Sequence, residues 1–317
     1  MVRTGVVAER PLEIAISGAS GLIGRRLTAY LIGGGHRVCR LVREREHAGA
    51  TAVYWNPATG DCDVGRLAGL DAVVHLAGEN IAAGRWTVAR QALLRSSRVE
   101  TTRFLCDHLA RLERPPRVLI AASAIGYYGD RGDELLTEES APGLGFLAEV
   151  SREWEAATEP ARLAGMRVVN LRIGMVLARE GGALGQMLTP FRLGLGGRIG
   201  SGRQYVSWIA REDLVRAVEH LLLATDVAGP VNAVAPQPIT NAEFTRALGR
   251  VVGRPTLLPL PAWVVRRLFG EMGREVLLVS TRVLPQRLTA SRFAFLYEDI
   301  ESALRAELSG PPDAARQ

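Results

Sequence analysis

Short apolar runs alternate with longer amphipathic segments along the first half of the chain. The runs are bounded by glycine, proline or charged residues, which is typical of strands buried on both faces. The segments between them place apolar side chains at the spacing of helices. We expect strands at 12–17, 37–42, 52–55, 71–77, 117–123 and 167–172, and helices at 21–32, 87–112 and 146–164. The alternation predicts an α/β fold with a Rossmann-type doubly wound parallel sheet.

The pattern changes in the second half of the chain. Glycine is dense across 178–205, which predicts loops or turns between short elements. Thr240 and Glu243 form a capping-box pattern at the start of a helix that Gly253 closes. A further helical segment is expected at about 262–278. The second half is therefore expected to be mostly helical.

These patterns suggest two domains. We expect a Rossmann domain at 12–235, with the loop 178–205 contributing to the cleft, and a smaller, mostly helical substrate domain at 236–308. The ends, 1–11 and 309–317, are expected to be flexible. A small-molecule substrate would lie between the domains, at the carboxyl ends of the strands.

A glycine-rich loop follows the first expected strand, with the spacing Gly18-x-x-Gly21-x-x-Gly24. The first glycine permits a tight exit from the strand, the second lets the backbone approach a pyrophosphate, and the third allows close helix packing. The helix that follows would present free N–H groups to the phosphates. Because the flanking strand and helix are both in place, the loop predicts dinucleotide binding rather than a purely structural turn.

The end of the second strand carries the signal for cofactor choice. Arg43 stands where a guanidinium can bind the 2′-phosphate of NADP(H). Glu44 is a competing signal, because an acidic side chain there accepts from the 2′-hydroxyl of NAD(H). NADP(H) is the preferred cofactor and NAD(H) is the alternative. A surface arginine without a ligand is the remaining interpretation of Arg43.

The chain of 317 residues has 39 basic residues, all arginine, against 33 acidic ones, giving a net charge of +6. Arginine cannot replace lysine as a Schiff-base former, so lysine-dependent aldolase and pyridoxal-phosphate chemistry are excluded, and Walker-type chemistry with them. The hydrophobic share of 47% is ordinary for a globular protein. The arginines are scattered and form no basic stripe with interleaved aromatics, so nucleic acid is not an expected partner.

Three cysteines, Cys39, Cys62 and Cys106, are far apart and form no metal-ligand pattern with histidine. Reduced thiols fit a cytoplasmic protein best. No apolar run reaches the length of a membrane span, and the first residues contain no signal-peptide stretch, so a membrane partner is not expected. The expected assembly is a monomer or a homodimer.

Several stretches together resemble the extended short-chain dehydrogenase/reductase superfamily: Gly18 to Gly24, Leu76-Ala77-Gly78 after the fourth strand, and Ser123 at the end of the fifth. Longer stretches are similar to one atypical branch, an NAD(P)-dependent epimerase-like family with a C-terminal domain of unknown function. These stretches are 76–82 with 85–87, 123–129, 190–197, 207–209 with 213–214, 270–272 and 282–285. The resemblance covers about residues 12–300. With the glycine loop and Arg43, it implies a cofactor site formed by Gly18, Ser20, Gly21, Leu22, Ile23, Gly24, Arg43, Leu76, Ala77, Gly78 and Ser123.

The resemblance fails at the superfamily's catalytic pair. Conventional members use Tyr-x-x-x-Lys on the helix after the fifth strand, where the lysine lowers the pKa of the tyrosine that exchanges a proton with the substrate. Here Phe146 stands in the tyrosine place and Val150 in the lysine place. Because the chain has no lysine, no shifted alignment restores the pair. The fold and the cofactor are implied, but this mechanism is not.

Other side chains are candidates for the acid/base work. Ser123 could hydrogen-bond a carbonyl, and Tyr127 or Tyr128 could face the nicotinamide, with packing in the wall of the site as the alternative for both tyrosines. Glu79 is either a buried base or a cap of the long helix. His75 lies in an apolar strand and is expected to be a core histidine.

Two functions fit these observations. The first is an NADP(H)-dependent oxidoreductase or epimerase that acts on an unknown small molecule through a non-standard proton donor. The second is a non-catalytic NADP(H)-binding sensor or scaffold, which the loss of the Tyr-Lys pair would explain. Arg192 and Trp208 either line the substrate cavity or join the two domains.

Overall fold

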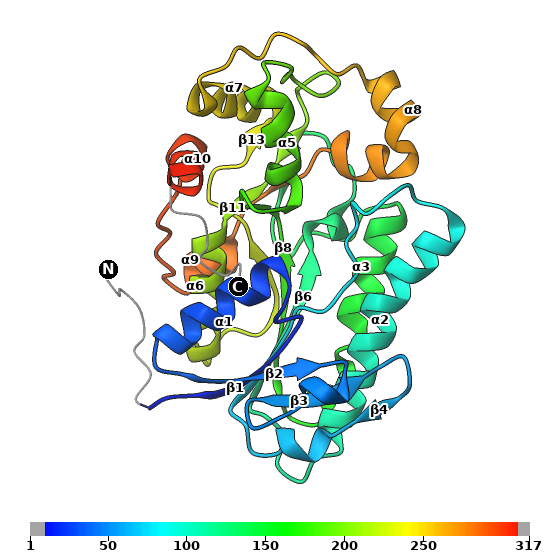
Figure 1. Ribbon diagram of the computed structural model, residues 1–317, viewed down its shortest axis with the longest axis vertical. Helices are drawn as coiled ribbons and strands as arrows, with labels where there is room; N and C mark the ends of the chain where they lie inside the picture. The colour runs from blue at the N-terminus through cyan, green and yellow to red at the C-terminus, as the bar shows by residue number, and fades with distance from the viewer. Residues whose placement is uncertain (1–9, 310–317) are drawn as a thin grey trace.

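An eight-stranded sheet lies at the centre of the computed structural model, which describes residues 10–309 (Figure 1). The strands follow the order β12–β8–β6–β5–β1–β2–β3–β4, and all neighbours are parallel except β3 and β4. Their bounds are β1 (Glu13–Ser17), β2 (Arg37–Val42), β3 (Ala52–Asn56), β4 (Asp61–Cys62), β5 (Ala72–His75), β6 (Val118–Ala124), β8 (Arg167–Ile173) and β12 (Gly229–Ala233). The predicted Rossmann-type fold is confirmed.

The strand order reverses between β1 and β5. Chain order runs outward from β1 through β2 and β3 on one side, and from β5 through β6, β8 and β12 on the other. In sheets of this kind a dinucleotide binds in the crevice at the reversal, outside the carboxyl ends of the strands. Ser17 of β1 is in register with His75 of β5, so the loops that follow the two strands leave the sheet side by side.

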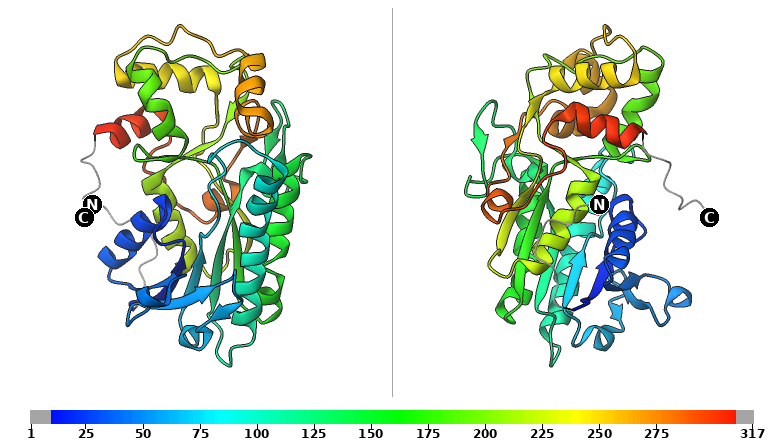
Figure 2. Two further views of the ribbon diagram at one scale, coloured as in Figure 1. Left: turned by 45° about the vertical axis from the view of Figure 1, so that its right-hand side comes forward. Right: turned by 90° about the vertical axis from the view of Figure 1, so that its left-hand side faces the viewer.

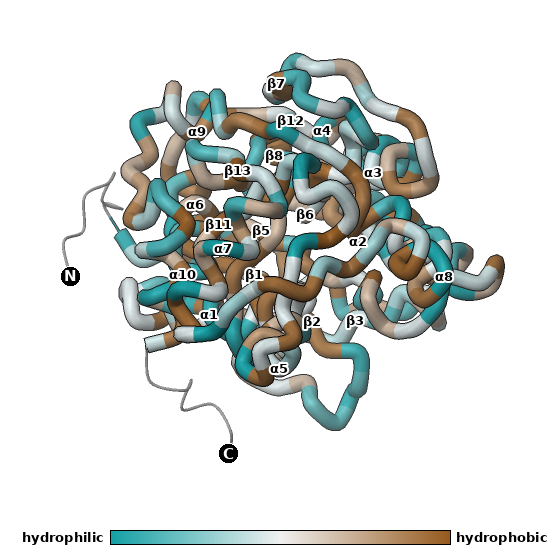
Figure 3. Tube along the Cα trace, turned by 90° about the horizontal axis from the view of Figure 1, so that it is seen from above, coloured by the Kyte–Doolittle hydropathy of each residue, from teal (hydrophilic) through white to brown (hydrophobic). Residues whose placement is uncertain are grey.

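Helices cover both faces of the sheet. On one face lie α1 (Leu22–Gly33) and α6 (Arg211–Leu223), and on the other lie α2 (Val88–Ala110), α3 (Phe146–Ala156) and α4 (Glu159–Leu163) (Figures 1 and 2). Seen along the long axis of the molecule, the strands lie between these two groups (Figure 3). This double cover explains why the strands are apolar on both faces.

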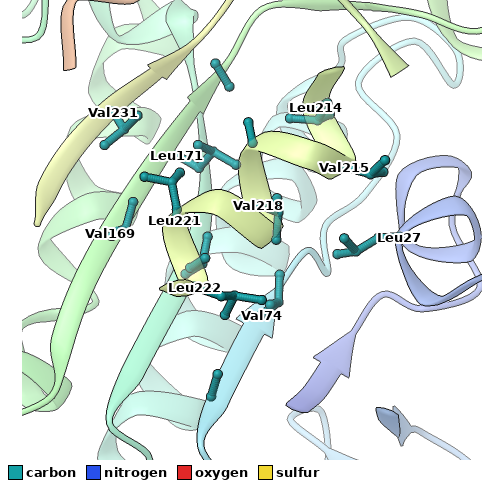
Figure 4. Close-up of a cluster of buried hydrophobic side chains, with 14 of the residues drawn as sticks. Leu27, Val74, Val169, Leu171, Leu214, Val215, Val218, Leu221, Leu222 and Val231 are labelled. Atoms are coloured by element: carbon teal, nitrogen blue, oxygen red, sulfur yellow. The ribbon is translucent and has the colours of Figure 1, made fainter. Parts of the chain in front are cut away.

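The core beneath α6 shows how the cover is built (Figure 4). Leu214, Val218 and Leu221 recur at helical spacing and are fully buried. They pack against Val169 and Leu171, two residues of β8 that point to the same face of the sheet. Helical and strand periodicities therefore agree at this interface.

A second group of helices stands at the carboxyl edge of the sheet, and we call it the helical lobe (Figure 1). It consists of α5 (Gly182–Arg192), α7 (Asn241–Val252), α8 (Ala262–Met272), the π-helix Gly273–Leu277 and α10 (Ile300–Ser309). Its own core includes Leu188, Phe191, Trp208, Phe244 and Leu304. Residues that precede α6 in the sequence and residues that follow it thus share one core.

Three short strand pairs, a short α-helix and three 3₁₀-helices (Arg45–His47, Val64–Leu67 and Ile125–Tyr128) complete the fold. The pairs are β7 (Leu135–Leu136) with β14 (Arg282–Val283), β9 (Met175–Leu177) with β11 (Trp208–Ala210), and β10 (Tyr205–Val206) with β13 (Ile239–Thr240). The α-helix is α9 (Gln286–Ala290), which packs beside β12.

The prediction of loops across 178–205 is wrong in part, because α5 occupies the first half of this segment. Leu184, Leu188 and Phe191 recur at helical spacing and are buried. The many glycines in this segment made the helical spacing of these three residues hard to recognise, although a count of apolar positions would have found it.

Two predicted helices are broken. The segment 146–164 divides into α3 and α4 at Thr158, whose hydroxyl donates to the Glu155 carbonyl at 2.7 Å. The segment 262–278 changes course at Gly270, which has a φ of +59° that is outside the helical range. The other predicted elements agree with the structure to within two residues at each end.

The predicted flexible ends fall mostly outside the described residues, since 1–9 and 310–317 are not described. Of the remainder, Arg10 donates to the Asp71 carboxylate, and Ser309 is the last residue of α10.

The predicted capping box of α7 is present, and it provides a test of lobe stability. The Thr240 hydroxyl accepts from the Glu243 N–H at 3.3 Å, and the Glu243 carboxylate accepts from the Thr240 N–H at 2.7 Å. We expect Thr240→Ala to lower the free energy of unfolding by about 1 kcal/mol, as loss of a helix cap does. Urea denaturation measures this change. An equal loss in Thr51→Ala, at an exposed threonine outside any helix, would contradict it.

Candidate functional site

The glycine loop is packed tightly at the crevice between β1 and β5. Gly18 has a φ of +69°, and a Cβ atom there would lie 2.8 Å from the carbonyl carbon of Leu76. A Cβ atom on Gly24 would overlap the Gly18 carbonyl oxygen. Larger residues at either position would push the loop away from β5 and from α1. The structure therefore brings the loop and the Leu76–Gly78 segment together, as the sequence predicted.

The N-terminus of α1 opens at this loop without an internal cap. Gly21 is the N-cap residue and has no side chain to accept from the first N–H groups, and the first turn contains no acidic residue. Ser20 and Gly21 are exposed, and Leu22 and Ile23 begin the helix. A helix end of this kind offers N–H donors and positive potential, which suits a phosphate.

The side chains after β2 differ in how they are engaged. Arg43 is exposed and makes no hydrogen bond or ion pair with any of residues 10–309. Glu44 lies 3.0 Å from His47, and Arg45 pairs with Asp61. Among these three residues, Arg43 is the one whose charged group has no partner within residues 10–309, so it is open to a ligand.

A buried hydrogen-bonded chain runs beneath the loop. The Nδ1 atom of His75 lies 2.6 Å from the Ser17 hydroxyl, and its Nε2 atom lies 3.0 Å from the Thr102 hydroxyl. Trp154 donates to the same threonine at 2.8 Å. Burial lowers the pKa of His75 to about 4. His75 is therefore a neutral core histidine, as predicted.

The place of the missing catalytic pair is filled by packing. Phe146, the first residue of α3, meets Trp86 edge to face with 5.4 Å between ring centroids. Val150, one turn further along the helix, is buried. The Glu275 carboxylate, from the lobe, accepts from the Leu147 N–H at 3.2 Å. This part of α3 thus offers aromatic and aliphatic contacts at the two positions where the sequence resemblance placed the missing tyrosine and lysine.

A buried polar network lies behind Ser123. The Ser123 hydroxyl donates to the Glu155 carboxylate at 2.7 Å. Glu155 also accepts two hydrogen bonds from Arg172, at 2.7 and 2.8 Å. A third Arg172 N–H donates to the Tyr128 hydroxyl at 2.9 Å, and that hydroxyl donates to Asn232 at 2.7 Å. The network joins β6, α3, β8 and β12.

The two adjacent tyrosines differ sharply within this network. Tyr128 is fully buried with its hydroxyl engaged on both sides, and burial raises its pKa to about 12 although Arg172 acts in the opposite direction. Tyr127 is half-buried, and its hydroxyl has no hydrogen-bond partner within residues 10–309. Its ring lies against the Arg172 guanidinium, with 3.5 Å from the central carbon to the ring centroid. Tyr127 therefore has the free hydroxyl of the pair.

Neither predicted role of Glu79 matches its surroundings. Its side chain is 39% exposed and lies 3.1 Å from Arg90, so it is not a buried base. The cap of α2 is Thr87, whose hydroxyl accepts from the Arg90 N–H. Glu79 instead forms a half-exposed ion pair with the first turn of α2.

Arg192 and Trp208 were expected either to line the substrate cavity or to join the two domains. Trp208 belongs to the lobe core, and its indole N–H donates to the Gln237 carbonyl at 3.2 Å. Arg192 is exposed at the end of α5.

Three members of the network were not foreseen from the sequence: Glu155, Arg172 and Asn232. Arg172 left a signal, because it is a charged residue inside an otherwise apolar strand. Glu155 and Asn232 left none, since an acidic residue on a helix and an asparagine near a strand end are common on surfaces.

Two further observations concern residues 10–309. No helix there is long and apolar enough to cross a membrane. No group of three or more His, Cys, Asp or Glu side chains in that range is placed to hold a metal ion.

The family follows from comparison with known sequences. The profile of the NAD dependent epimerase/dehydratase family matches residues 14–234, which include the whole glycine loop and the buried network. The chain belongs to this family. A second profile, a domain of unknown function (DUF1731), matches residues 260–307, so the resemblance inferred from the sequence is confirmed in both parts.

Members of the family are similar to this chain over most of their length. An epimerase family protein of Mycobacterium bovis, Mb2239, is 46% identical over 291 residues, which is 92% of this chain and 96% of that protein. The Bacillus subtilis epimerase family protein YfhF is 35% identical over 92% of this chain and 97% of its own length. A crystal structure of the human epimerase family protein SDR39U1 with NADPH superposes with a TM-score of 0.87 and 36% identity, over 95% of this chain and all of that one.

The buried His75 makes a prediction about acid stability. In the unfolded chain its pKa is near the ordinary 6.5, whereas it is about 4 in the fold, so only the unfolded state gains a proton between these values. We expect His75 to remove about 3 kcal/mol of stability as the pH falls from 6.5 to 4. The check is denaturant unfolding of the native protein and of His75→Gln across this window. Parallel pH profiles for the two proteins would contradict the prediction.

Proposed function

We propose that the protein is an NADP(H)-dependent oxidoreductase or epimerase that acts on a small molecule, with Tyr127 as its proton-transfer group. The observation that carries this proposal is the unpartnered Tyr127 hydroxyl, held beside the carboxyl ends of the strands by contact of its ring with Arg172. The unpaired cysteines fit a cytoplasmic enzyme.

Four observations support the cofactor site. The glycine loop has the close packing that a dinucleotide-binding turn requires, and the α1 N-terminus offers uncapped N–H groups. The Arg43 guanidinium is open for a 2′-phosphate, which favours NADP(H) over NAD(H). SDR39U1, a relative with 36% identity, was crystallised with NADPH.

A bound nicotinamide would give or accept a hydride, so the protein must move a proton at the substrate oxygen. The Ser123 proton is directed to Glu155 and the Tyr128 proton to Asn232. Tyr127 is the remaining hydroxyl of the three predicted candidates, and it can donate to or accept from a substrate. The Arg172 guanidinium against its ring would stabilise the negative charge that develops as the proton leaves.

Glu155 and Arg172 act as positioning residues in this proposal. Burial lowers the pKa of Arg172, but hydrogen bonds and attraction from Glu155 outweigh this effect, so the net shift is upward and the guanidinium stays charged. A permanently charged, fixed group suits the stabilisation of a transient charge, because it needs no reorganisation during the reaction.

A test of cofactor choice uses Arg43→Asp. We expect this change to weaken NADPH binding by roughly 10- to 100-fold, because one charge-assisted contact is lost, and to leave NADH binding within a few-fold. Titration of nicotinamide fluorescence gives both dissociation constants. The matched control is Arg40→Asp, at an exposed arginine on β2, the strand that Arg43 follows. Equal effects on NADPH and NADH would show that Arg43 does not bind the 2′-phosphate.

A test of the proton donor uses Tyr127→Phe. We expect turnover, found by screening carbonyl and alcohol substrates for a change in nicotinamide absorbance, to fall by about 10²- to 10⁴-fold while NADPH affinity stays unchanged. Tyr297→Phe, at another half-buried tyrosine, is the control and should keep full turnover. Undiminished turnover in Tyr127→Phe would reject this role. Tight NADPH binding with no turnover on any substrate would instead favour the non-catalytic sensor.

A further inference from the structure

Two segments of the helical lobe are rich in arginine and lack acidic residues. Residues 181–210 contain three arginines and no Asp or Glu. Residues 244–270 contain five arginines and no Asp or Glu. These arginines are Arg192, Arg198, Arg203, Arg246, Arg250, Arg254, Arg266 and Arg267. Both segments therefore carry only positively charged side chains.

The two segments meet at the end of the lobe farthest from the sheet. Ile199 and Leu260 form an isolated bridge, with hydrogen bonds of 2.8 Å from the Leu260 N–H to the Arg198 carbonyl and from the Gly200 N–H to the Leu260 carbonyl. The connection from α7 to α8 runs across this end of the molecule (Figures 1 and 2). We call this surface the arginine face.

Seven of the eight arginines of the arginine face form no ion pair within residues 10–309. Of its eight arginines, one, Arg250, forms an ion pair, with Glu301 at 2.8 Å. Arg254 donates to the Arg192 carbonyl, which leaves its charge uncompensated. The face is therefore a concentrated positive surface, able to attract a strongly anionic partner.

Large apolar side chains are exposed on the same two segments of the chain. Leu257 is 81% exposed, Trp263 70% and Leu193 68%, and Leu195 and Leu258 are also exposed. Exposed leucines and tryptophan on projecting segments are costly in water and mark an interaction surface.

A pocket of about 290 Å³ opens among these residues. It is lined by Arg198, Thr245, Arg246, Thr256 and Leu257, with Ala242 and Pro259. Two guanidinium groups at its wall suit a phosphate group, and Leu257 beside it suits an acyl chain.

We propose that the arginine face docks the protein on the surface of an anionic phospholipid bilayer, with a headgroup phosphate at the Arg198–Arg246 pocket and Leu257 and Trp263 in the interfacial layer. Basic residues interleaved with leucine and tryptophan are the combination that peripheral contact with anionic lipid requires. A second copy of the chain is disfavoured, since it would place eight further arginines against these. The contact needs no spanning helix, so it differs from the kind of membrane partner that the sequence argued against.

The test is co-sedimentation of the full-length protein with vesicles. We expect binding to vesicles of phosphatidylcholine mixed with phosphatidylglycerol, none to phosphatidylcholine alone, and a steep loss of binding with added salt. The double variants Leu257→Ser/Trp263→Ser and Arg198→Gln/Arg246→Gln should each bind at least about tenfold more weakly. Leu163→Ser/Leu144→Ser and Arg152→Gln/Arg40→Gln, at exposed positions elsewhere, are the matched controls and should bind normally.

A second readout does not depend on affinity. Tryptophan emission should shift to the blue on anionic vesicles, and the shift should be lost in Trp263→Phe while binding remains. NADPH affinity should be unchanged in all these variants, which separates this proposal from the function proposed above.

Three results would overturn the proposal. The first is no binding to anionic vesicles at low salt, or equal binding to neutral ones. The second is an equal loss of binding in the control variants. The third is a dimer in sedimentation that Leu257→Ser/Trp263→Ser converts to monomer without any vesicle binding, which would assign the face to self-association.

Discussion

The guanidinium of Arg172 holds the carboxyl end of the sheet in one arrangement. It bonds Glu155 twice and Tyr128 once, and its central carbon lies 3.5 Å from the centroid of the Tyr127 ring. A buried ion pair of this kind adds little net stability, because desolvation offsets the attraction, but removing one partner leaves a buried charge unpaired. Its main effect is on the arrangement of the neighbouring hydroxyl groups rather than on stability. It fixes which hydroxyls are engaged, and it leaves that of Tyr127 available.

The helical lobe is tied to the same region. Its Glu275 carboxylate accepts from the first turn of α3, the helix whose later residue Glu155 bonds Arg172. Gln91, near the start of α2, donates to Glu271 at 2.9 Å. The first turn of α3, where the sequence resemblance placed the missing tyrosine and lysine, is therefore part of a packed contact between the lobe and the sheet domain. Phe146 packs there against Trp86.

Periodicity and loop chemistry predicted most of the fold. The strands of the parallel sheet, the glycine loop and the α7 capping box rest on local rules of backbone geometry, so the sequence carries them directly. The helix α5 was missed because glycine density masked its period. The site was predicted only in part: Ser123, Tyr127 and Tyr128 lie together, but their engagement depends on Glu155, Arg172 and Asn232, which come from distant segments. Such tertiary hydrogen bonds have no local pattern, and the same holds for the ion pair of Glu79 with Arg90.

The most direct test of the central claim is a crystal structure of the protein with NADPH bound. The account predicts that the Tyr127 hydroxyl lies within about 3.5 Å of the space over the nicotinamide face where a substrate oxygen must sit, with its ring still against Arg172. A structure in which another side chain occupies that space, and Tyr127 points away from the nicotinamide, would contradict it.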